Sequence, residues 1–268
     1  MTYKKTKIIC TIGPAVDTVD KIGMLIDAGM DAARLNFSHG STEVHRQYIQ
    51  NIRKAGKLKK KMIAIIQDLP GPKIRTGLLE NGAIELKENS TIKITSRDIT
   101  GNNKIISTNY PSLIYDVRKN EMILLDDGNF RLRVISDIPL NNEIECEIMS
   151  GGMLKERKGI NLPQTKLNLP SLTKKDLSFL NFGLENDVDF VAMSFIRSAD
   201  DIIQLRNKIK SRRKNVLIIA KIERPEAVEN IDSIINAADC IMVARGDMGV
   251  EISTEDVPLI QKKIIRKC

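Results

Sequence analysis

Two hydrophobic patterns alternate over the first 70 residues of the chain. Apolar runs at 7–12, 32–37 and 62–66 have the length of buried strands. The segments between them place apolar residues three or four positions apart, as in helices that cover a sheet. This order predicts β-α-β-α-β, and therefore parallel strands covered by helices.

The pattern changes between residues 73 and 168. Short runs there alternate apolar and polar residues with a period of two, and they are separated by turn sequences at 81–82, 101–103 and 126–129. Such frequent turns between alternating runs are typical of a small antiparallel β-barrel.

From Pro170 onward the first pattern returns. Apolar strands are predicted at 189–193, 216–220 and 240–244, and helices begin at the capping boxes Thr173-x-x-Asp176 and Ser198-x-x-Asp201. The chain thus predicts an α/β fold: a (β/α)₈ TIM-type barrel, incomplete because it has six βα units, with an antiparallel β-barrel domain inserted after the third strand.

We expect residues 1–71 to form the first segment of the barrel, 72–169 the inserted β-barrel lid domain, and 170–268 the second segment of the barrel, with strands four to six. A doubly wound open sheet is the alternative. It is weakened because Gly13-Pro14-Ala15 follows the first strand, where a dinucleotide site would show G-x-G-x-x-G.

Composition narrows the possible partners. The net charge of +8 includes lysine and arginine runs at 57–61 and 212–214, but these fall at expected helix ends and contain no aromatics. We therefore expect no nucleic acid partner, while an anionic small substrate fits the charge. The four cysteines form no C-x-x-C motif, and no apolar run is long enough to span a membrane. Free thiols, no membrane partner and a cytoplasmic location are expected.

Polar residues follow every predicted barrel strand. Lys221 and Glu223 are two positions apart, so they share one face of their strand; alone, such a pair would favour a structural ion pair. The other polar strand-end residues are Thr11, Arg34, Asn36, Ser38, Asp68, Ser194, Arg197, Arg245 and Asp247. Active sites of these barrels gather at the carboxyl ends of the strands, so the set predicts one site.

The chemistry of this set indicates phosphoryl transfer. Glu223 and Asp247 supply hard oxygen ligands for a divalent cation. Arg34 and Lys221 suit a phosphorylated anion, and Gly246 would let backbone amides approach a carboxylate. Such a site mainly positions groups and offsets charge.

The chain resembles the pyruvate kinases over essentially its whole length. The motifs that carry the resemblance, in the family's order and spacing, are ICTIGP (9–14), RLNFSHG (34–40), DLPGPKIRTG (68–77), KGINLP (158–163), SFIR (194–197), AKIE (220–223) and MVARGDMGVE (242–251). The resemblance implies that the inserted domain is a mobile lid over the barrel mouth. It implies the glycolytic transfer of a phosphoryl group from phosphoenolpyruvate to ADP, which gives pyruvate and ATP.

The resemblance also implies roles for single residues. Lys221 and Arg34 would be catalytic, at the transferring phosphoryl group, and Glu223 and Asp247 would bind Mg²⁺, with Mn²⁺ as an alternative ion. The implied substrate-binding positions are Arg34, Lys221, Ala244, Arg245, Gly246 and Asp247. The implied nucleotide-binding positions are Asn36, Phe37, Ser38, His39, Arg75 and Lys158. The implied potassium-site positions are Asn36, Ser38, Asp68 and the backbone of Leu69.

The chain departs from the family in two respects. Potassium-dependent members usually carry glutamate where this chain has Lys73 and threonine where it has Leu69. An ammonium fixed at position 73 would replace the ion, so we expect no potassium requirement. The family also continues beyond the position of Cys268 with two βα units and a regulatory domain, so we expect impaired turnover. Full-length relatives are expected to be homotetramers, which leaves the oligomeric state of this chain open.

Two other functions are compatible with the residues. One is a Mg²⁺-dependent aldolase or lyase for pyruvate or phosphoenolpyruvate, in which Lys221 could form a Schiff base. Arg75 and Lys158 in the lid argue against it, because a lyase has no nucleotide to clamp. The other is a catalytically silent, truncated paralogue that binds another protein through its sixth strand. We expect His45, on a helix, to serve packing or the surface rather than catalysis.

Overall fold

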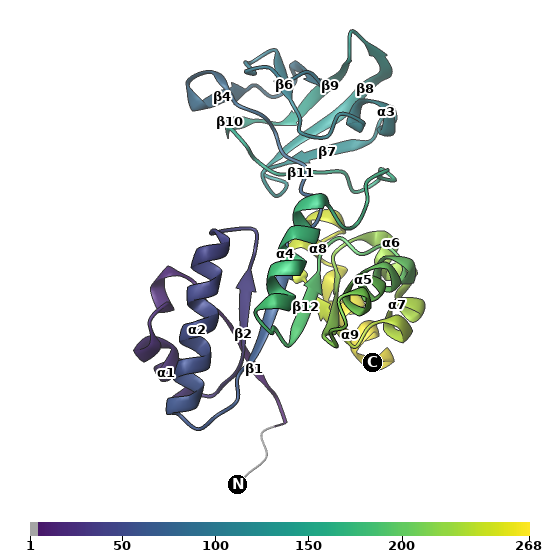
Figure 1. The fold of residues 1–268 in the computed structure, drawn as a ribbon. Coiled ribbons are helices and arrows are strands. Elements are labelled where there is room, and N and C mark those ends of the chain that lie inside the picture. Colours follow the sequence, from purple (N-terminus) through teal and green to yellow (C-terminus); the bar gives the residue numbers. More distant parts are fainter. Residues whose placement is uncertain (1–4) are drawn as a thin grey trace.

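The computed structural model describes residues 5–268, which form two bodies stacked one above the other (Figure 1). The lower body is built on one parallel six-stranded sheet. Its strands, in spatial order, are β1 (Ile8–Thr11), β2 (Met30–Asn36), β3 (Ala64–Leu69), β12 (Phe190–Met193), β13 (Leu217–Ile222) and β14 (Cys240–Val243). Spatial order follows chain order, so the sheet has no switch point and curls as a section of a barrel. The predicted incomplete barrel is confirmed, and the doubly wound sheet is wrong.

Helices connect the strands of this sheet. They are α1 (Val19–Asp27), α2 (Thr42–Leu58), α4 (Lys174–Glu185), α5 (Ala199–Ser211), α6 (Pro225–Glu229), α7 (Ile231–Ala237), α8 (Arg245–Glu251) and α9 (Val257–Lys267), with a 3₁₀ turn, η1, at Pro14–Val16. The capping box of α4 is confirmed: Asp176 N donates to Thr173 Oγ1 at 3.0 Å and Thr173 N to Asp176 Oδ2 at 2.8 Å. Within residues 5–268, no helix is both long enough and apolar enough to cross a membrane.

Helix α8 was not predicted from the sequence. It begins directly after β14, so Arg245, Gly246 and Asp247 lie in its first turn rather than in a loop. The helix has only seven residues and a mixed composition, so its sequence carries little helical periodicity.

The upper body, the lid, contains two sheets. Its elements are η2 (Glu80–Gly82), β4 (Ala83–Leu86), β5 (Thr91–Thr95), β6 (Ile105–Ser107), α3 (Leu113–Asp116), β7 (Met122–Leu125), β8 (Phe130–Leu140), β9 (Glu143–Ser150), β10 (Gly152–Lys155) and β11 (Ile160–Asn161). The larger sheet has the order β11-β7-β8-β9-β5-β6, and β10 pairs with β4. Pairing is antiparallel as predicted, except that β5 and β6 run parallel.

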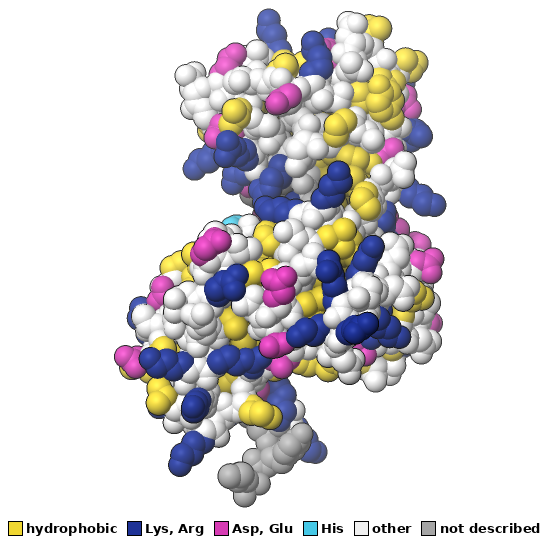
Figure 2. Space-filling model, viewed as in Figure 1, with side chains coloured by type: hydrophobic (Ala, Val, Ile, Leu, Met, Phe, Trp, Pro, Cys, Tyr) yellow, Lys and Arg dark blue, Asp and Glu magenta, His cyan; other side chains and the backbone are white. Residues whose placement is uncertain are grey.

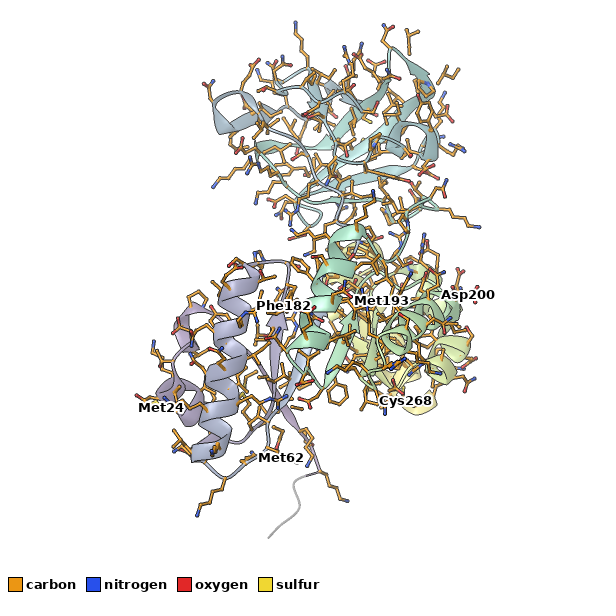
Figure 3. All side chains as sticks on the ribbon, in the orientation of Figure 1. Met24, Met62, Phe182, Met193, Asp200 and Cys268 are labelled. Carbon is orange, nitrogen blue, oxygen red and sulfur yellow. The ribbon has the colours of Figure 1, made fainter. Side chains whose placement is uncertain are left out.

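The barrel and the lid each have their own hydrophobic core. In the barrel, Phe182 and Met193 lie inside the body and are 7% and 1% exposed, whereas Met24 and Met62 lie at the surface (Figure 3). The main barrel cluster and the lid cluster share no member. All four cysteines are free thiols, as expected.

The lid core yields a stability prediction, because β8 carries one buried and one exposed leucine. Leu132 is fully buried and Leu140 is 73% exposed. Leu132→Ala leaves a cavity and should lower the free energy of unfolding of the lid by about 2–5 kcal/mol, while Leu140→Ala should change it by less than about 0.5 kcal/mol. Urea unfolding followed by the fluorescence of Tyr110 and Tyr115, which both lie in the lid, measures this difference. Equal losses in the two variants would contradict the described packing.

Candidate active site between the barrel and the lid

A cleft of about 320 Å³ lies where the lid meets the carboxyl ends of the barrel strands. Its lining residues come from both bodies: His39, Pro72, Lys73, Ile74, Arg75, Asp126, Asp127, Lys158, Gly159, Ile160, Asn161, Leu162, Leu167, Phe195, Arg224, Asp247 and Glu251. Lysine and arginine side chains gather at this junction on the face shown in Figure 2. The lining holds four lysine or arginine side chains and four carboxylates, so it offers contacts both to an anion and to a cation.

A buried carboxylate organises the floor of the site. Asp68, near the end of β3, is 2% exposed. Its Oδ2 accepts a hydrogen bond from Arg34 Nε at 2.7 Å, and its Oδ1 lies 3.3 Å from Lys221 Nζ. Arg34 also donates from Nη1 to Thr11 Oγ1 at 3.0 Å. The structure therefore brings together strand-end residues of β1, β2, β3 and β13, as the sequence predicted.

Lys221 and Glu223 form the predicted pair on one face. Lys221 Nζ lies 2.8 Å from Glu223 Oε1 and donates to Ser194 Oγ at 2.6 Å. Burial by itself would lower the pKa of Lys221, but the carboxylates of Glu223 and Asp68 outweigh it and raise that pKa above the ordinary lysine value. Lys221 is therefore a fixed ammonium ion.

Glu223 is almost completely buried, at 1% exposure. Its Oε2 accepts a hydrogen bond from Phe195 N at 2.9 Å. Burial raises the pKa of Glu223; the Lys221 ammonium opposes this shift and the charge of Asp247 adds to it. Asp247 lines the cleft, and the backbone of Phe195, which holds Glu223, lines it too.

These two carboxylates fit a Mg²⁺ or Mn²⁺ ion that shares its ligands with a substrate. Glu223 Oε1 accepts no hydrogen bond beyond its contact with Lys221, and the Asp247 side chain is exposed in the cleft. Within residues 5–268, no three His, Cys, Asp or Glu side chains group as metal ligands. Mg²⁺ commonly binds through one or two carboxylates and completes its shell with water and phosphate oxygens.

The backbone after β14 is open to a ligand. A Cβ added at Gly246 would meet no atom within 4 Å. Ala244 is the N-cap residue of α8, and Arg245 and Gly246 follow it in the first turn. Three of the substrate-binding positions implied by the resemblance, Ala244, Arg245 and Gly246, therefore lie side by side next to Asp247.

The loop after β2 carries the expected nucleotide positions. Asn36 Oδ1 accepts a hydrogen bond from Ser38 N at 3.1 Å, which turns the loop back on itself. Phe37 is 1% exposed and stacks on the His45 ring, with centroids 4.0 Å apart. His45 is buried and its Nε2 contacts the His39 carbonyl at 2.8 Å. His45 therefore packs in the core and supports the loop. From the sequence, a packing role and a surface position were both possible.

The lid contributes cations to the cleft from two segments. Arg75 donates from Nη1 to the Arg157 carbonyl at 2.9 Å, and Lys158 pairs with Asp126 at 2.8 Å. Residues 75 and 159 form an isolated antiparallel bridge, so the two segments are adjacent. The sequence identified Asp126 only as a turn residue, because its partner follows it by 32 positions and no local pattern joins them.

Lys73 also lines the cleft, as Arg75 and Lys158 do. Burial is the main cause that lowers its pKa below the ordinary lysine value; Arg75 and Lys221 lower it further, and Asp247 and Glu223 oppose them. The ammonium of Lys73 therefore lies within electrostatic reach of the same carboxylates that Lys221 faces.

The whole described chain matches one family. The model of the pyruvate kinase barrel domain covers residues 3–268. The chain belongs to the pyruvate kinase family.

Individual relatives agree with this assignment. The chain is 50% identical over 266 residues to the pyruvate kinase of Geobacillus stearothermophilus. The alignment covers 99% of this chain and 45% of that protein. It is 43% identical over 265 residues to the pyruvate kinase of Staphylococcus aureus (strain MRSA252), with the same coverage. A crystal structure of a pyruvate kinase from Cryptosporidium parvum superimposes with a TM-score of 0.94 at 41% identity and covers 98% of this chain and 55% of that chain. The chain thus spans about half the length of the pyruvate kinases it matches.

The buried imidazole of His45 yields a pH prediction. Burial lowers its pKa below 6.5, while the His39 carbonyl opposes the shift. The unfolded chain therefore binds this proton more readily, and the stability of the folded state should fall as the pH drops below about 6.5. His45→Gln keeps a donor for the His39 carbonyl and removes the titration.

Chemical denaturation at several pH values between 8 and 5.5 measures this effect. The stability of the wild-type chain should decrease more steeply over this interval than that of His45→Gln. Parallel stability profiles for the two chains would show that burial does not lower the pKa of His45.

Proposed function

We propose that this site performs the pyruvate kinase reaction: transfer of a phosphoryl group from phosphoenolpyruvate to ADP, which gives pyruvate and ATP in glycolysis. The observation that carries the proposal is the buried Asp68 carboxylate with Arg34 and Lys221 on either side of it, beside the Glu223 and Asp247 carboxylates. Asp247 lines the cleft beneath the lid, and so does Phe195, whose backbone N–H donates to Glu223.

The two cations act on the group in transfer. The bond between phosphorus and the enol oxygen breaks as a bond forms to a terminal oxygen of ADP, and the departing enolate takes up a proton to become pyruvate. Arg34 and Lys221 face the equatorial oxygens and offset their charge without reorganisation, because Asp68 already holds both. Mg²⁺ held by Glu223 and Asp247 would neutralise phosphoryl and enolate oxygens.

Other groups orient the two substrates. The exposed backbone of Ala244, Arg245 and Gly246 would bind the carboxylate of phosphoenolpyruvate, because amides there can approach a ligand closely. The nucleotide positions are Asn36, Phe37, Ser38, His39, Arg75 and Lys158. The lid cations among them would bind the phosphates of ADP, which would displace Asp126 from Lys158.

The state of Lys221 disfavours an aldolase mechanism. A Schiff base requires a neutral amine as nucleophile. The raised pKa of Lys221 keeps it an ammonium ion, which suits phosphoryl transfer. We further propose a cytoplasmic location and substrates that are small anions, with neither nucleic acid nor membrane as a partner.

The reaction is tested by a coupled assay of pyruvate formation. The chain should be measured beside a version extended through two further βα units of a relative, because a barrel with six strands leaves β1 and β14 at open edges. We expect faster turnover in the extended chain, and a loss of roughly 10²–10³-fold in it on Lys221→Met. Lys214→Met, at an exposed ion pair with Asp187, is the matched control and should change little. An extended chain that folds, binds Mg²⁺ and ADP and makes no pyruvate would favour the silent, protein-binding paralogue.

The position of Lys73 supports activity without potassium. Lys73 lines the same cleft as Asp247, and Leu69 offers no side-chain oxygen to a monovalent cation. Turnover of the extended chain in potassium-free buffer should therefore rise less than about twofold on addition of KCl. The double variant Leu69→Thr/Lys73→Glu should become dependent on potassium. It loses the lysine ammonium and gains a hydroxyl and a carboxylate that can bind K⁺. Large activation of the unaltered sequence by K⁺ would refute the proposal.

A further inference from the structure

Arg224 is a buried cation that the reaction does not use. It follows Glu223 directly, is 1% exposed and is one of the largest completely buried side chains in residues 5–268. Its guanidinium forms a two-point contact with Glu226, with Nε to Oε2 at 3.0 Å and Nη2 to Oε1 at 3.1 Å. Its Nη1 lies 3.4 Å from Glu251 Oε2. Such a group is costly to bury unless each contact is maintained.

The same guanidinium contacts the segment that returns from the lid. Nη2 donates to the carbonyls of Leu162 at 3.4 Å and Thr165 at 3.3 Å. Glu251 adds a second contact to this segment, because its Oε1 accepts a hydrogen bond from Asn161 Nδ2 at 2.7 Å. Arg224, Glu251 and Asn161 thus join the end of β13, the end of α8 and strand β11 of the lid. We call these three residues the clamp.

The clamp holds one face of α8 through Glu251. Asp247 and Glu251 are four positions apart, so they lie on one face of the helix. A helix of seven residues has little stability of its own, and its orientation must come from tertiary contacts. Buried Met248 and the clamped Glu251 supply such contacts. Holding Glu251 therefore aims Asp247 at the cleft.

The clamp also acts on the other carboxylate of the site. Arg224 is bonded through the backbone to Glu223, so its fixed side chain limits movement at the end of β13. One guanidinium therefore restrains both carboxylates through short paths, one along the chain and one through Glu251 and a single helical turn.

We propose that Arg224 is a positioning residue that sets the distance and orientation of Glu223 and Asp247 and couples them to the lid through Glu251 and Asn161. The proposal rests on the proposed function, which assigns the two carboxylates to a divalent cation. A positioning role differs from that of a purely structural ion pair. A structural pair would contribute to stability, and its removal would leave metal affinity unchanged once folding is restored.

The test uses a variant that removes both charges together. Arg224→Gln alone leaves Glu251 buried without its cation and should destabilise the chain. The double variant Arg224→Gln/Glu251→Gln carries no unpaired buried charge at these two positions, so we expect it to recover most of that stability. Mn²⁺ binding, measured by electron paramagnetic resonance on the 268-residue chain, should nevertheless be weakened roughly 10-fold to 100-fold, as for other partners that orient metal ligands.

The matched control is Arg206→Gln. Arg206 also binds a carbonyl and a carboxylate, Ala237 O at 2.7 Å and Asp239 Oδ2 at 3.0 Å, but it lies outside the cleft. We expect its Mn²⁺ affinity to equal that of the wild-type chain. A double variant that regains stability and binds Mn²⁺ like the wild type would overturn the proposal.

Hydrogen–deuterium exchange separates this proposal from the proposed function. In the double variant, the segments 160–165 and 245–251 should both exchange faster, because the clamp joins them. If the wild-type chain bound no Mn²⁺ while both segments responded, the metal assignment would be wrong and the coupling of lid and helix would stand. Unchanged exchange in 160–165 would refute the clamp, whatever the Mn²⁺ result.

Discussion

The Asp68 carboxylate is the interaction on which the candidate site depends. It lies between Arg34 and Lys221, and without it two cations would face each other in a poorly solvated floor. Its own burial would be unfavourable without them. The result is a preformed pair of positive groups, Arg34 on β2 and Lys221 on β13. Asp68, on β3, holds both. An anionic group that approaches from the cleft meets charges that are already in place, so little reorganisation opposes its binding.

Much of this arrangement could be predicted from the sequence because its signals are local. Lys221 and Glu223 share a face through strand geometry alone, and the polar strand ends meet because all barrel strands run parallel. Arg224 and Asp126 were not singled out as functional, since their partners, Glu251 and Lys158, lie far along the chain. The parallel pairing of β5 and β6 was missed for a different reason: alternation fixes the faces of a strand but not the direction of its neighbour.

The two connections between barrel and lid are built differently. The outgoing one passes through Gly71, whose φ of +66° and close approach to Phe195 exclude a side chain. The returning one is held by arginines: Arg197 donates to the carbonyls of Leu167 and Leu169 at 2.8 Å, and Arg224 acts further back along the segment. Charge-assisted hydrogen bonds from Arg197 and Arg224 therefore fix the returning segment against the barrel.

The charges of the site explain why its ligands should bind together. Counted with the charges of their residue types, Arg34, Lys73 and Lys221 balance Asp68, Glu223 and Asp247, so the floor has no net charge without a ligand. A divalent cation alone would add an excess of positive charge, and a phosphorylated anion alone an excess of negative charge; each offsets the other. A glutamate at position 73 would lower the net charge by two and create a need for an added monovalent cation. On the proposed function, lysine at this position would supply that charge covalently, without a binding equilibrium.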